Sequence, residues 1–366
     1  MGPRGVISLA ATSLQRDMHV FCGPPPGGMG CGSGSKGRRH YTVGMSERDV
    51  LMRLAAGETC SGAVLARELG VSRAAVWKQI QALRAEGVPI EAHAGAGYRL
   101  AHPVKLLDLA ALRGVLTPAV ASCWPHIEVH WQLDSTSSEL QRREPQLPSG
   151  SVILAERQTA GRGRRGRKWL APPAMGLTFS LLWRFQKGFA ALAGLSLVVG
   201  IALAETLHAM GAHAVALKWP NDVQHDGRKL AGILVELGGD FLGPCFAVIG
   251  MGLNLWLPQE VRVQAGQPVA DMVDACDGTV PDRNQLVGAL LAALAEALDL
   301  FAREGFSPFQ ARYAELDALV GRELTVQKDS ESFRVLACGV DSRGALRVRR
   351  GKDALVLDSA EVSVRP

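Results

Sequence analysis

The hydrophobic pattern becomes regular after residue 45 and predicts three short helices, over residues 47–56, 62–69 and 73–86. In the third, Val76, Ile80 and Leu83 recur at the spacing that lines one face of a helix. Serines stand where N-terminal caps are expected, and glycines stand where helices end: Ser61, Ser72, Gly57, Gly70 and Gly87. The second and third helices, separated by a tight turn at residues 70–71, therefore predict a helix-turn-helix.

The same stretch also predicts a basic helix face and two short strands. Arg73 and Lys78 point away from the apolar face of the third helix, and Ser72 opens that helix, a set that suits phosphates and base edges. Residues 88–93 and 98–100 are typical of two strands around a glycine-rich turn, the wing. We expect a winged helix that binds DNA through these three residues. The alternative is a protein-binding winged helix with a solvated basic face; Trp77 fits packing on the wing as well as contact with DNA.

From residue 104 the pattern is mixed α/β. Residues 151–155 and 227–236 predict a strand and a hairpin. The most apolar stretch, residues 190–204, is about fifteen residues long and falls short of the roughly twenty that cross a bilayer. We interpret it as a buried helix and expect no membrane partner. Residues 321–366 alternate apolar and polar positions at the strand period, which predicts a small β-barrel.

Composition narrows the class of protein and its compartment. The chain has 366 residues, of which 47% are apolar and 20% charged, enough for two or three globular domains. Seven cysteines without a CxxC pair and nine histidines without a Cys/His grouping argue against a disulfide framework and a structural metal, and favour a reducing cytoplasm. The first 44 residues are rich in glycine and proline and poor in core-forming residues, so we expect a disordered extension.

Residues 161–169, here called the Arg-Gly loop, read Gly-Arg-Gly-Arg-Arg-Gly-Arg-Lys-Trp between two apolar stretches. A solvated basic tail would lie in a linker, and this run does not. The GxGxxG spacing fails as a dinucleotide fingerprint, because Leu-Ala-Pro-Pro at residues 170–173 forbids the helix that must follow, and the Gly-Lys-Ser/Thr of a Walker A loop is missing. We interpret the segment as a mobile loop whose arginines hold carboxylate or phosphate oxygens.

Two later segments favour a nucleotide in the same site. Residues 218–223 place a lysine, an amide and a carboxylate around a proline turn after a strand, where phosphate and metal ligands are often gathered. Lys229 stands at the start of an apolar strand. Alone, such a lysine is usually a surface group, so its interpretation as a ligand contact depends on the two neighbouring clusters.

In combination, the Arg-Gly loop, residues 218–222, residues 229–237 and the winged helix resemble the bifunctional biotin protein ligases that also repress biotin synthesis. The resemblance covers residue 45 to the C-terminus. After the extension (1–44) it implies an α+β multi-domain fold: a winged helix-turn-helix DNA-binding domain (45–103), a mixed α/β biotin- and ATP-binding catalytic domain resembling class II tRNA synthetases (104–318), and an SH3-like β-barrel (319–366).

The resemblance also implies roles for single residues. The residues expected at biotin are Ser135, Thr136, Ser137, Gln158, Arg162, Gly163, Arg164 and Lys229. Those expected at ATP are Arg167, Asn221, Asn254 and Arg365. Of these, the catalytic residues would be Arg162, Arg164 and Lys229, with Asp222 a candidate general base. The chain departs from the family in two places: Ser137 stands where Asn is frequent, and no aromatic residue near Val269 can cover adenine.

The activity implied by the resemblance joins biotin and ATP, with Mg²⁺, into biotinyl-5′-AMP under the loop as a lid. Biotin then passes to a lysine of the biotin carboxyl carrier protein of acetyl-CoA carboxylase. The adenylate-bound chain would form a homodimer on operator DNA and repress biotin synthesis genes. Two alternatives remain: a ligase whose winged helix serves only structure or dimer contacts, and a regulator that senses biotin without catalysis.

Overall fold

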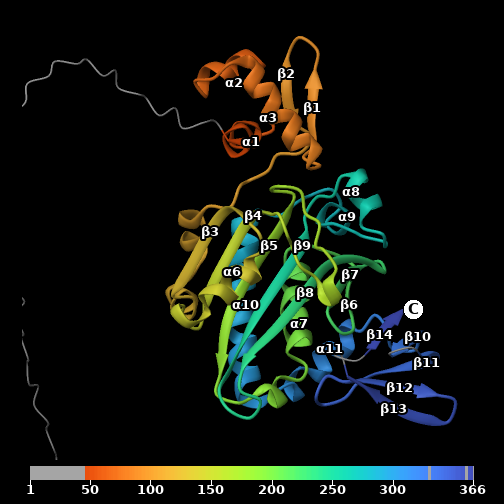
Figure 1. Ribbon diagram of the computed structural model, residues 1–366. Helices are drawn as coiled ribbons and strands as arrows, with labels where there is room; N and C mark the ends of the chain where they lie inside the picture. The colour runs from red at the N-terminus through yellow and green to blue at the C-terminus, as the bar shows by residue number, and fades with distance from the viewer. Residues whose placement is uncertain (1–45, 329–330, 359–361, 366) are drawn as a thin grey trace, which may run out of the picture. The chain divides into compact units, whose positions relative to one another are not determined.

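The computed structural model describes residues 46–328, 331–358 and 362–365 (Figure 1). The extension expected over residues 1–44 lies outside the described residues. The first elements of the described chain are α1 (Glu47–Leu54), α2 (Gly62–Glu68), α3 (Arg73–Ala85), β1 (Ile90–His93) and β2 (Gly97–Leu100). The hydroxyls of Ser61 and Ser72 accept hydrogen bonds from the backbone N–H groups of Val64 and Ala75, each at 3.1 Å. Both predicted caps are therefore confirmed.

The helix-turn-helix forms because the predicted apolar positions meet in one core. Val76, Ile80 and Leu83 of α3 are fully buried and pack with Leu65 of α2. Gly70 turns the chain between the two helices with a φ of +65°, a left-handed conformation that favours glycine. Strands β1 and β2 pair antiparallel, with Ile90 opposite Leu100, and form the predicted wing.

A seven-stranded mixed sheet in the order β3-β4-β5-β9-β8-β7-β6 forms the central part of the molecule. Its strands are β3 (His126–Leu133), β4 (Ser151–Gln158), β5 (Gly176–Phe185), β6 (Val215–Lys218), β7 (Asp222–His225), β8 (Arg228–Gly239) and β9 (Cys245–Asn254). Only β3 and β4 run parallel; the other neighbours are antiparallel. The strand and hairpin expected over residues 151–155 and 227–236 are confirmed.

Helices cover both faces of this sheet. Successive strand residues point to opposite sides, so both faces carry apolar side chains that pack against helices. The long helices are α7 (Leu195–Ala209) and α10 (Arg283–Glu304), which lie together on one face (Figure 1). On that face Leu154 and Ile249 join the main core, whereas Ile153 and Val248 pack with Leu140 of α6 (Thr136–Arg143) on the other. The remaining helices are α4 (Leu109–Val115), α5 (Pro118–Cys123), α8 (Gln259–Gln264), α9 (Met272–Ala275) and α11 (Gln310–Leu316).

Two apolar stretches are long enough to span a membrane by length and composition, Phe189–Ala209 and Arg283–Glu304. Most of each is buried in the protein core, 67% and 56% of the apolar window respectively, as in the core helices of a folded domain. The interpretation of residues 190–204 as a buried helix is confirmed over residues 195–204 by α7, whereas the first residues of the stretch precede that helix.

The C-terminal residues form an antiparallel five-stranded sheet in the order β13-β12-β11-β10-β14. Its strands are β10 (Glu323–Lys328), β11 (Glu331–Val340), β12 (Leu346–Arg350), β13 (Asp353–Leu357) and β14 (Val362–Arg365). Leu324, Val326, Leu346 and Val348 are buried on one face, as their alternation predicts. The pairings between the described strands form a sheet and do not show the expected barrel.

Candidate active site

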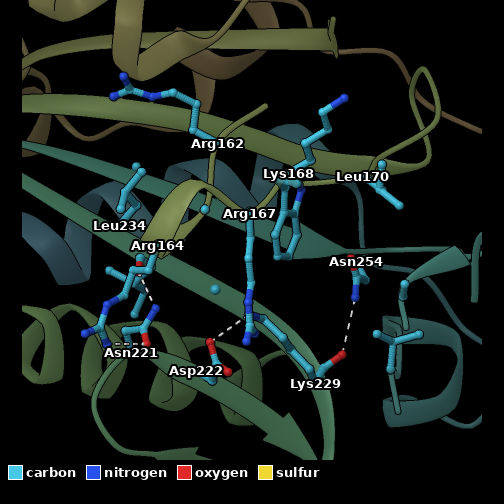
Figure 2. A pocket seen from close by; sticks show the side chains of 18 of the residues that line it. Arg162, Arg164, Arg167, Lys168, Leu170, Asn221, Asp222, Lys229, Leu234 and Asn254 are labelled. Atoms are coloured by element: carbon cyan, nitrogen blue, oxygen red, sulfur yellow. Dashed lines mark hydrogen bonds and ion pairs between the residues drawn. The ribbon is translucent and has the colours of Figure 1, made fainter. Parts of the chain in front are cut away.

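A cavity of about 950 Å³ lies where strand ends of the central sheet meet the Arg-Gly loop (Figure 2). Its walls bring together predicted residues from separate segments of the chain: Ser135, Thr136, Ser137, Gln158, Arg162, Gly163, Arg164, Arg167, Asn221, Asp222, Lys229 and Asn254. Arg365 is the exception among the predicted ligase residues. Its backbone pairs with Thr325 in the C-terminal sheet, and its side chain lies outside the described part of the chain.

One end of the cavity is built from buried neutral polar groups. Ser135 caps α6, and the amide N–H and hydroxyl of Thr136 donate to Oε1 of Gln158 at 2.8 and 3.2 Å. The hydroxyls of Thr136 and Ser137 lie 2.7 and 2.9 Å from that of Ser180 on β5. Such a set of fixed donors and acceptors suits an uncharged polar ring better than an anion.

The Arg-Gly loop folds back on itself as a small hairpin. Gly163 N–H donates to the carbonyl of Arg167 at 2.7 Å, and Trp169 N–H donates to the carbonyl of Gly161 at 3.0 Å. Arg165 has a φ of +56°, an unusual conformation for a residue with a side chain. The next element after the loop is strand β5, where a dinucleotide fingerprint would require an α-helix.

The cations of this loop point in different directions. Arg162 pairs with Glu236 and donates to Gln141 at 3.2 Å, and in Figure 2 its side chain points away from the Lys229 and Asp222 side of the cavity. Arg164 donates to Oδ1 of Asn221 at 3.0 Å. Burial, followed by the charge of Arg165, lowers the pKa of the Arg164 guanidinium, and Asp222 opposes this shift. A bound anion would relieve that unfavourable environment.

Lys229 lies at the junction of the cavity walls. Its Nζ is 2.8 Å from Oδ1 of Asp222 and lies 5.7 Å from the centre of the Trp169 ring. Both charged side chains are about one fifth exposed, 18% and 22%. The pair is therefore partly desolvated, which strengthens both the attraction between the two side chains and the attraction of the Lys229 ammonium for an anionic ligand beside it.

Two asparagines hold the backbone around Lys229. Asn221 donates from Nδ2 to the carbonyl of Ile233 at 2.8 Å while its Oδ1 accepts from Arg164. Asn254 is buried and donates to the carbonyls of Lys229 and Ala270 at 3.3 and 2.9 Å (Figure 2). The Asn254 amide thus joins β8 to the segment that follows β9.

Trp169 is a site residue that sequence reasoning missed. Its ring lies over Gly252 and Gly232; a Cβ on Gly252 would collide with the ring, and a Cβ on Gly232 would lie 3.2 Å from it. Its buried Nε1 has no hydrogen-bond partner among the described residues. Ser180 was also missed. The available signal was glycine at alternate positions inside apolar strands, which marks close approach by another group.

The predicted DNA-contacting residues are exposed: Ser72 as the N-cap of α3, and Arg73 and Lys78 within that helix. Trp77, beside Lys78, is 56% exposed, so it is not packed away under the wing. The helix thus presents two cations, a hydroxyl at its N-terminus and a large aromatic ring to solvent, a set that fits nucleic acid.

The described residues contain no group of three or more His, Cys, Asp or Glu side chains arranged to hold a metal ion. The carboxylates nearest the cavity cations, Asp222 and Glu236, are each paired with one, Lys229 and Arg162. Divalent metal would therefore fit best as a companion of a phosphate ligand, its charge balanced by phosphate oxygens.

Comparison with known proteins assigns this geometry to a family. Residues 130–254 match the Biotin/lipoate A/B protein ligase family, and residues 47–99 match an HTH domain. Over 312 residues the chain is 39% identical to the bifunctional ligase/repressor BirA of Escherichia coli K12, covering 85% of this chain and 95% of that protein. The chain belongs to the BirA family of bifunctional ligase/repressors. The resemblance drawn from the sequence motifs is confirmed.

Two further relatives cover the central region. The chain is 34% identical over 232 residues to the biotin--[acetyl-CoA-carboxylase] ligase of Paracoccus denitrificans, covering 63% of this chain and 96% of that protein. The structure of the Aquifex aeolicus biotin protein ligase in complex with biotin and ATP superposes with a TM-score of 0.58 at 26% identity, covering 66% and 99% of the two chains. The mixed sheet is thus the ligase fold of this family.

Proposed function

We propose that the chain forms biotinyl-5′-AMP from biotin and MgATP and transfers biotin to a lysine of a biotin carboxyl carrier protein. The observation that carries this is one cavity with two unlike ends: buried neutral groups around Thr136 and Gln158, and cations around Arg164, Arg167 and Lys229. The neutral end suits the ureido ring of biotin, and the cationic end suits a carboxylate meeting a triphosphate.

The first step is limited by charge. A carboxylate oxygen of biotin must attack the α-phosphorus of ATP while pyrophosphate leaves, and the two anions repel each other. Lys229, Arg164 and Arg167 stabilise the charge that gathers at the new mixed anhydride and on the leaving group, with Mg²⁺ arriving on ATP. Arg162, now paired with Glu236, would turn inward only as the loop closes.

The second step needs a proton acceptor. The carrier lysine attacks the anhydride carbonyl, AMP leaves, and the amine loses a proton. Asp222 pairs with Lys229; if Lys229 turns to the adenylate, Asp222 is released to accept that proton. The closed Arg-Gly loop keeps water from the anhydride until the carrier docks.

The ligase reaction is tested by incubating the whole chain with biotin, MgATP and a biotin carboxyl carrier domain, and reading the carrier by mass spectrometry. The expected result is one added biotinyl group at a single lysine, dependent on ATP. An unmodified carrier would refute the transfer. A chain that also shows no biotin-dependent exchange of pyrophosphate into ATP would be a sensor rather than an enzyme.

For the repressor activity, we propose that α3 enters the operator with Ser72, Arg73 and Lys78 at phosphates and bases. Biotin-dependent footprinting on a promoter of biotin synthesis genes tests it. Lys78→Ala should weaken binding and reduce the salt slope by about one counterion, while Arg67→Ala on the neighbouring helix serves as a matched control. Absence of protection for the wild-type chain would leave a ligase without repressor activity.

The remaining assignments complete this proposal. Residues 45–103 are the DNA-binding domain, 104–318 the catalytic domain that resembles class II tRNA synthetases, and 319–366 an SH3-like domain that closes over ATP and receives the carrier, with Arg365 near the nucleotide. Adenylate closes the Arg-Gly loop and favours a homodimer on a palindromic operator. The working compartment is the cytoplasm, where ATP and reduced cysteines coexist.

A further inference from the structure

The winged helix is joined to the ligase sheet by more than the connecting chain. Ala174 and Met175, just before β5, are buried in the same apolar cluster as the core of α1 to α3. The connecting chain is itself held, because Leu107 N–H donates to the carboxylate of Glu156 on β4 at 2.5 Å. Apolar contacts have no preferred direction, so alone they would let the winged helix turn on the sheet.

One arginine of the ligase sheet reaches two helices of the winged helix at once. Arg157 lies on β4, and its Nη1 is 2.9 Å from Oε2 of Glu47, the first residue of α1. Its Nη2 donates to the carboxylate of Glu86, the C-cap of α3. We call Arg157, Glu47 and Glu86 the domain triad. Because its two bonds end on different helices, the triad opposes rotation about the apolar contact.

The domain triad is sheltered, and its two carboxylates depend on the arginine. The three side chains are between 22% and 26% exposed. Burial raises the pKa of the Glu86 carboxyl, the charge of Arg157 opposes that shift, and the charge of Glu47 adds to it. The two acids therefore repel each other and share one counterion. Without Arg157, they would bring uncompensated negative charge to the domain contact, a costly arrangement.

The same end of α3 meets the ligase domain at a second place. Gly87 follows the C-cap with a φ of +89°, and a Cβ on it would lie 3.2 Å from side-chain atoms of both Pro172 and Val261. Such close packing leaves the end of α3 no room to move further toward the ligase domain. The triad and this contact together fix the base of the helix that presents Arg73 and Lys78.

We propose that Arg157 is a positioning residue for operator recognition, which fixes the direction in which α3 leaves the ligase domain. This inference rests on the proposed function, in which two chains place their α3 helices on a palindrome. If that direction is fixed, the distance and the rotational phase between the two helices are fixed as well. Only one separation of the half-sites then fits the protein.

The test measures binding to three DNAs: the palindromic operator, the same operator with five base pairs inserted between its half-sites, and a single half-site. The insertion turns one half-site by about half a helical turn. The variants are Arg157→Met and, from the other side of the contact, Glu47→Gln combined with Glu86→Gln. Arg312→Met is the control, because its partner Glu205 also belongs to the ligase domain. Biotinyl-5′-AMP is supplied directly, and circular dichroism confirms folding.

Wild type and the control should bind the palindromic operator at least about tenfold more tightly than the one with the insertion. If the aligned population falls to a tenth, both triad variants bind the palindromic operator about tenfold more weakly. They should distinguish the two separations by less than about twofold, yet bind the single half-site as wild type does.

Three results would overturn the inference. The first is equal discrimination between the two separations by wild type and Arg157→Met. The second is a wild-type chain that is indifferent to the separation. The third is weakened binding of the single half-site by the triad variants, which would mean that the winged helix is damaged rather than misaligned. A wild-type chain that binds none of the three DNAs would instead refute the proposed repressor function.

Discussion

Two chain segments border the cavity and are held in opposite ways. The Arg-Gly loop has cations on most of its positions, closes by backbone hydrogen bonds of its own, and leaves Arg167 and Lys168 exposed. The segment after β9 carries one cation, Arg262, which is more than three quarters buried and fully paired. In the first segment Arg162 pairs with Glu236 while Arg167 and Lys168 are exposed, and in the second Arg262 is neutralised within the protein.

This difference shows how one fold can combine a movable and a fixed wall. Exposed cations attract an anionic ligand, so we expect the loop that carries them to close when that ligand arrives. A cation already bound to Asp271 and Asp274 has little to gain from the ligand.

The largest effect is expected at Lys229, where both walls meet. Lys229→Met removes the cation nearest the proposed anhydride and leaves Asp222 unpaired. Adenylate formation in a single turnover should slow by about 100-fold. Lys187→Met, at an exposed lysine bonded to the carbonyl of Arg303, is the matched control. A rate within twofold of wild type would show that Lys229 does not act in the catalytic step.

An intermediate effect is expected when only the movable wall is disturbed. Gly252→Ala places a methyl group against the Trp169 ring, so the end of the Arg-Gly loop must shift at an overpacking cost of about 1–3 kcal/mol. The adenylate should dissociate roughly tenfold faster, as read by the release of labelled adenylate. Gly114→Ala, which meets nothing within 4 Å, should behave as wild type. An unchanged rate of adenylate release from Gly252→Ala would show that Trp169 plays no part in loop closure.

The smallest effect is expected at an exposed ion pair, which serves as a reference for the buried pair of Arg262 and Asp271. Asp134 accepts from Arg142 at 2.7 and 2.9 Å, and chiefly this hydrogen bonding lowers its pKa from 3.8 to about 2. Because the folded pKa is the lower one, the contribution is present above pH 4 and is lost toward pH 2.

Asp134→Asn should therefore reduce the free energy of unfolding by only ~0.5 kcal/mol at pH 7, since both side chains are about half exposed. Urea denaturation at pH 7 and at pH 2.5 checks it: the two proteins should differ at the first pH, and the difference should shrink at the second. A difference that grows on acidification would contradict the assignment of this pKa.

The winged helix could be predicted almost completely, because its signals are local. Ser72 and Gly70 mark a helix start and a turn within a few residues of the elements they define, and the observed bounds differ from the predicted ones by one or two residues. The ligase residues were found by a different route. Their neighbours in the sequence say little, and the resemblance to a family supplied their grouping.

What sequence reasoning missed depends on distant packing. Trp169 becomes a site residue because Gly252, on another strand, leaves room for its ring. Arg262 becomes an anchor only when the chain folds back to bring Asp271 and Asp274 beside it. Neither partnership has a fixed spacing in the sequence, so no local pattern could have predicted it.

Amide hydrogen exchange tests the contrast between the two walls most directly. Residues 161–169 and 257–270 are compared in the ligand-free chain and after addition of biotin and MgATP. We predict that residues 257–270 exchange slowly in both states, whereas the Arg-Gly loop exchanges fast without ligand and slows at least about tenfold with it. Equal exchange of both segments in the free chain, with equal protection on binding, would contradict the account.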